Sequence, residues 1–94
     1  MPVFRNDDAA YLSWIGENPD GFIVNTRSTP DKNYLVLHRA SCGMISTPRD
    51  DPAAYTGNAY IKLAAPSLPE MRALMAQVMG APCDVSKSCG KCKP

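Results

Sequence analysis

Residues 34–39, with the sequence YLVLHR, are the most strand-like run of this 94-residue chain. Apolar residues occupy consecutive positions, so they would point to both faces of a sheet, as is typical of a strand in its interior. The single histidine, His38, lies near the end of this run, and Cys42 follows it in the stretch HRASC. The run therefore predicts a central strand that ends beside two potential metal ligands.

Further strands are expected on either side of this run. GFIVN (21–25) precedes it, separated by TRSTPDKN (26–33), whose Ser, Pro, Asp and Asn residues are typical of a hairpin connection. AYIKLAA (59–65) follows as another strand, and ASCGMIS (40–46) could add a short edge strand. The pattern predicts a small, mainly antiparallel sheet of three to four strands.

Two helices are expected to pack on this sheet. NDDAAYLSWIGENPDG (6–21) has apolar residues at helical spacing, and Asn6, Asp7 or Asp8 could cap its first amides. The second helix starts at SLPE, where Ser67 and Glu70 have the spacing of a capping box, and it ends at Gly80. The fold class predicted is therefore α+β.

The domain organisation follows from length and composition. The chain is long enough for one hydrophobic core, and we expect a single domain over residues 1–94. Residues 1–82 would form the α+β core. Residues 83–94 have almost no apolar bulk and predict an irregular, cysteine-bearing tail that docks on it.

Charge and hydropathy exclude few function classes. The net charge is +1, which gives no strong overall attraction for nucleic acid or anionic membranes. No stretch approaches the roughly 20 apolar residues of a membrane span, and no signal-peptide pattern opens the sequence. We expect a cytoplasmic protein without a membrane partner, in which metal-bound thiolates are favoured over disulfides.

The cysteines point to a metal site. Cys89 and Cys92 form a C-x-x-C motif, whose sulfurs can reach one ion from a tight turn. Zinc takes four such ligands, and His38 and Cys42 are the natural other half, with Cys83 as the alternative that would leave His38 in the core. The sequence predicts a structural zinc, against the alternatives of a disulfide and of unligated thiols.

Two other function classes remain open. A thiol-based enzyme could use Cys89 with Cys92, or Cys42 activated by His38. Only two residues follow Cys92, too few for the helix that a redox pair needs, and the His38/Cys42 pair has no evident orienting group, so a non-enzyme is favoured. A nucleic-acid-associated module would need a basic face, for which the candidates are Arg27, Arg39 and Lys62. The classes of partner considered are therefore nucleic acid and another protein.

The sequence also resembles a small bacterial domain family of unassigned function. The resemblance lies in YLSWIGENPDGFIVNTR (11–27), YLVLHRASC (34–42), YIKLAA (60–65) and the C-terminal CGKC (89–92). It implies that Cys83 is an additional cysteine, which favours His38 with three cysteines as the ligand set. It also implies an association with nuclease modules, and hence with nucleic acid.

Overall fold

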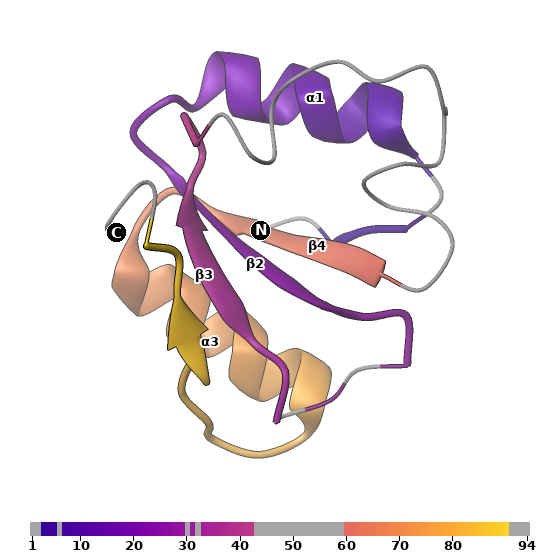
Figure 1. The fold of residues 1–94 in the computed structure, drawn as a ribbon, viewed down its shortest axis with the longest axis vertical. Helices are drawn as coiled ribbons and strands as arrows, with labels where there is room; N and C mark the ends of the chain where they lie inside the picture. Colours follow the sequence, from indigo (N-terminus) through magenta and orange to yellow (C-terminus); the bar gives the residue numbers. More distant parts are fainter. Residues whose placement is uncertain (1–2, 6, 30, 32, 43–59, 91–94) are drawn as a thin grey trace.

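The computed structural model describes residues 3–5, 7–29, 31, 33–42 and 60–90. Two helices and five strands lie in these residues, so the predicted α+β class is confirmed (Figure 1). No helix in this part of the chain is long and apolar enough to cross a membrane. The elements in chain order are β1 (Val3–Phe4), α1 (Asp8–Glu17), β2 (Phe22–Arg27), β3 (Val36–Arg39), β4 (Tyr60–Ala65), α3 (Leu68–Met79) and β5 (Lys87–Ser88).

The strands form one sheet in the order β1-β4-β2-β3-β5. All neighbours are antiparallel except β5, which runs parallel to β3. The expected count of three to four strands was too low, because β1 and β5 are two-residue strands without a periodicity of their own. The expected edge strand at 40–46 lies mostly outside the described residues.

The two helices cover opposite faces of the sheet, α1 above and α3 below in Figure 1. Alternation along β2 explains this arrangement, because Ile23 packs in the core cluster under α1 while Val24 packs in the cluster over α3. Each helix adds a buried stripe to its own cluster. The stripes are Tyr11 and Ile15 from α1, and Met71, Leu74 and Met75 from α3.

The helix ends are stabilised as the sequence predicts. Of the three candidates for the first cap, Asp7 is the one used, and its side chain accepts a hydrogen bond from Ala10 N at 3.1 Å. Ser67 caps α3 by accepting from the backbone N–H of Glu70. Gly80 ends α3 in the left-handed conformation, with φ of 79°, which costs glycine little.

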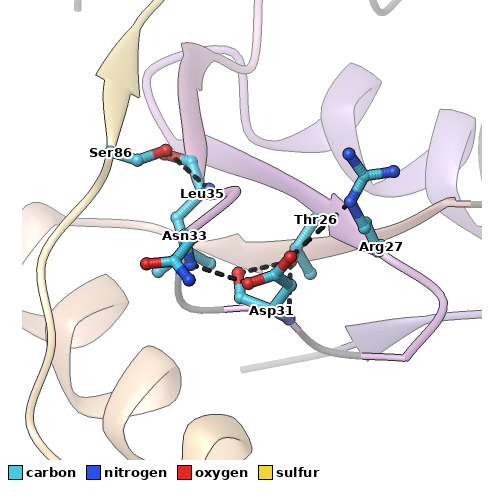
Figure 2. A network of polar contacts seen from close by, with 6 residues as sticks. All are labelled: Thr26, Arg27, Asp31, Asn33, Leu35 and Ser86. Carbon is cyan, nitrogen blue, oxygen red and sulfur yellow. Dashed lines mark hydrogen bonds and ion pairs between the residues drawn. The ribbon is translucent and has the colours of Figure 1, made fainter.

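The tail is held by the sheet as far as it is described. Ser86 N donates to Leu35 O at 2.8 Å, and Leu35 N donates to the Ser86 hydroxyl at 2.9 Å (Figure 2). Cys89 N then donates to Leu37 O at 2.9 Å. The expectation of an irregular tail is therefore corrected at Lys87–Ser88, where the chain pairs with β3.

Gly21 lies at a close contact between the sheet and the turn that joins α1 to β2. A Cβ at Gly21 would lie 2.9 Å from the Trp14 ring and 3.1 Å from the Ala65 carbonyl oxygen. We expect Gly21→Ala to lower the free energy of unfolding by about 1–3 kcal/mol, because backbone on one side and an indole on the other must shift. Urea denaturation measures the loss.

The matched control is Gly16→Ala, on the exposed side of α1, where a Cβ meets nothing within 4 Å. This substitution should raise the free energy of unfolding by up to about 1 kcal/mol, since alanine is the better helix former. Equal effects at the two positions would contradict the contact proposed at Gly21.

Candidate metal centre

Three of the predicted metal ligands lie together in the structure. The ligand atoms of His38, Cys42 and Cys89 are all within 4.8 Å of one another. The two sulfurs are 3.9 Å apart and are not joined by a disulfide. The group could hold a metal ion.

Strand pairing explains how the group assembles. In the parallel β3–β5 pair, Leu37 lies opposite Ser88, so the next residues along, His38 and Cys89, are neighbours on the same face. Cys42 returns to this face through a turn, in which its N–H donates to Arg39 O at 3.0 Å. The sheet edge and the turn thus bring together cysteines 47 residues apart in sequence.

The group is buried beneath α1. His38, Cys42 and Cys89 are 7%, 4% and 6% exposed, and the cysteines share a core cluster with Tyr11 and Ile15. Nδ1 of His38 is enclosed and has no hydrogen-bond partner among the described residues. A buried polar atom without a hydrogen-bond partner lowers the stability of the fold by about 1–3 kcal/mol. A ligand bound to this nitrogen would remove that cost.

Electrostatics favour the imidazole form that binds metals. Burial lowers the pKa of His38 below its usual value of 6.5, and the positive charge of Lys62 lowers it further. At neutral pH the ring is therefore neutral, with a lone pair available for a metal.

The sulfur spacing suits tetrahedral coordination. Two thiolates bound to zinc at roughly 2.3 Å with tetrahedral angles lie about 3.8 Å apart, close to the 3.9 Å between Cys42 Sγ and Cys89 Sγ. The donor set of one imidazole and two thiols also suits zinc rather than magnesium or calcium, which take oxygen ligands.

The two remaining cysteines are Cys83 and Cys92. Cys92 lies outside the described residues. Cys83 is half-buried and packs against the core cluster on the α3 face, with Met71 and Leu74, whereas the group lies on the α1 face. This placement argues against Cys83 as the ligand that would complete the site.

The three nucleic-acid candidates are separated. Arg27 is the last residue of β2 and lies opposite Tyr60 of β4, with its guanidinium 4.8 Å from the Tyr34 ring centroid and 3.6 Å from the Asp31 carboxylate (Figure 2 shows the ion pair). Arg39 lies at the opposite end, opposite Phe22. Lys62 is only 4% exposed. The described residues do not form one basic face from these cations, and nucleic-acid association stays a prediction.

Lys62 has a role that the sequence did not indicate. Its Nζ donates to Asn25 Oδ1 at 2.6 Å, on the face of the sheet that also carries His38. The lysine thus acts on the pKa of His38 from inside the protein rather than presenting a surface charge. No sequence signal could have shown this, because lysine in a strand is ordinarily exposed.

The structure gives the surroundings of the thiols that were candidates for catalysis. His38 and Cys42 lie within the same group, but the described part of the group contains no carboxylate that could orient the imidazole. A triad needs such a third residue. Among the described residues, Cys89 has Cys42 as a sulfur neighbour at 3.9 Å.

Comparison of the chain with protein-family models, with curated proteins and with solved structures finds no match.

Proposed function

We propose that this protein is a small binding or accessory module whose fold is stabilised by a structural zinc ion. The ligands are His38, Cys42, Cys89 and Cys92. The observation that carries the proposal is the convergence of three ligand atoms within 4.8 Å, one from a ring whose Nδ1 is buried without a partner. A fully protein-coordinated ion has no open position for substrate, as in structural zinc sites.

The shortness of the strand that pairs the tail with the sheet supports a structural role. β5 has only two residues, and both are exposed. A strand this short buries too little surface to offset its conformational entropy by itself. Zinc bound to Cys89, directly after β5, and to His38 in β3 would join the tail to the sheet, and its binding free energy would add to folding.

Native mass spectrometry tests the proposal directly. The purified protein should carry one zinc ion per chain, and a strong chelator should remove it and lower the melting temperature. Protein that is free of metal as purified, and that melts at the same temperature with added zinc or chelator, would contradict the proposal.

A matched pair of variants tests the fourth ligand. Cys92→Ser should lose zinc at chelator concentrations that wild type resists, since one of four coordinate bonds is removed. Cys83→Ser should retain zinc like wild type, because Cys83 packs on the other face of the sheet. The reverse result would assign Cys83 to the site.

A further inference from the structure

We propose that Cys42 and Cys89 are also a redox-modification site, at which a peroxide converts the two metal-binding sulfurs into a disulfide. Release of the ion in this step rests on the proposed zinc site. The pairing itself rests only on the observed position of the two sulfurs. It differs from the pairing within C-x-x-C that sequence spacing alone would favour.

The two sulfurs already lie close together, as this reaction requires. Cys42 Sγ and Cys89 Sγ are 3.9 Å apart in the buried cluster under α1. A disulfide needs about 2.05 Å between sulfurs, which is an approach of roughly 2 Å. Cys42 lies in a turn outside the strands, so rotation of its side chain does not require a ladder hydrogen bond to break. Held in place, the two thiols react within one molecule, which is far faster than reaction between molecules.

The chemistry is balanced with hydrogen peroxide as the oxidant. One thiolate attacks a peroxide oxygen, the O–O bond breaks, and a sulfenic acid and hydroxide form. The second sulfur then attacks the sulfenic sulfur, the S–S bond forms, and the sulfenic oxygen leaves as water. Overall, two thiolates, one peroxide and two protons give one disulfide and two waters, and the two electrons pass from the sulfurs to the peroxide.

The disulfide would replace the ion as the link between the tail and the sheet. Cys89 directly follows β5 and Cys42 lies in the turn after β3, so the new bond joins the same two segments that the metal joins. A disulfide no longer supplies two thiolates, and an ion held by the remaining ligands is lost. Oxidation therefore exchanges a metal link for a covalent link and releases zinc.

Peptide mapping of oxidised wild-type protein is the experiment. Full-length protein is purified under reducing conditions, its metal content is measured by native mass spectrometry, and it is treated with equimolar hydrogen peroxide. Unreacted thiols are then alkylated before digestion. We expect a peptide that links Cys42 to Cys89, one zinc released per disulfide, and recovery of zinc binding after reduction with a dithiol and addition of zinc.

Variants control for the other cysteines. Cys83→Ser should give the same linked peptide, and Cys42→Ser should abolish it. Should Cys42→Ser fail to fold, His38→Asn keeps both sulfurs and should form the disulfide faster than zinc-loaded wild type, because it no longer retains the ion.

Two outcomes would overturn the inference. One is a linkage of Cys89 to Cys92, and the other is oxidised protein in which Cys42 still alkylates. These outcomes are separable from failure of the zinc proposal. If metal-free protein forms the Cys42–Cys89 link, the zinc proposal is contradicted and the redox inference is supported. If zinc-bound protein links Cys89 to Cys92, the zinc proposal is supported and the redox inference is contradicted.

Discussion

Cys89→Ser is expected to lower the free energy of unfolding by about 4 kcal/mol in buffer with zinc at a thousandfold excess over its dissociation constant. Cys89 is buried and is the residue of the proposed site that directly follows β5. A serine hydroxyl is a poor zinc ligand, so the stabilisation that binding adds to folding is lost. For a domain whose total stability is about 5–15 kcal/mol, this is a large fraction. Urea denaturation with and without added zinc measures it.

Two comparisons separate metal loss from simple loss of packing. Cys83→Ser, on the other face of the sheet, should cost less than about 1 kcal/mol under the same conditions. In excess chelator, the difference between Cys89→Ser and wild type should also shrink below about 1 kcal/mol, since both proteins then lack the ion. A difference that persists at full size in chelator would show that Cys89 stabilises the fold without a metal.

Leu63→Ala is expected to lower the free energy of unfolding by about 2–5 kcal/mol. Leu63 lies in β4 and is 0% exposed, in the cluster formed by the sheet and α3. Its truncation removes buried methyl groups and leaves a cavity among β-strand and helix side chains that cannot close fully. Denaturation monitored by circular dichroism measures the effect.

Leu68→Ala is the matched control, because it makes the same change in the first turn of α3, where the side chain is 37% exposed. We expect a change within about 0.5 kcal/mol, as for most surface substitutions. Similar losses at Leu63 and Leu68 would contradict the placement of Leu63 in the buried cluster on the α3 face. The α3-face cluster contains none of the three metal-group residues, so Leu63→Ala should leave zinc stoichiometry unchanged.

The position of the group relates the fold to the proposed function. It lies where the short edge strand β5 meets β3, beneath α1. The opposite cluster is formed by long apolar side chains from β4 and α3 and needs no metal for its packing. A metal at the β3–β5 edge would therefore link the sheet to a strand of only two exposed residues.

Elements with strong local signals could be predicted from the sequence. The run that contains β3, the strand at β2 and the second helix each carry a periodicity or capping pattern within a few residues of themselves. Ser67 and Gly80 show this best, since the structure uses both residues as caps of α3. The class of the fold follows from such elements.

Elements that depend on distant partners could not be predicted. β1 exists because Val3 and Phe4 pair with Leu63 and Lys62. β5 likewise exists because it pairs with β3. A two-residue strand has no hydrophobic period, and its backbone hydrogen bonds depend on where another segment lies. The burial of the Lys62 side chain could not be predicted for a similar reason. It depends on the contact with Asn25 on a neighbouring strand, which only the fold shows.

The sequence alone determined that the ligand types for zinc are present, that His38 lies near the end of a strand with Cys42 soon after it, and that Cys89 belongs to a C-x-x-C motif. Only the tertiary structure decided which of these residues meet. His38, Cys42 and Cys89 converge on the α1 face, and Cys83 packs on the other. The physical reason is that a one-residue shift in the register of β5 would turn Cys89 to the opposite face of the sheet. That register is set by hydrogen bonds between β5 and β3, and spacing along the chain does not encode it.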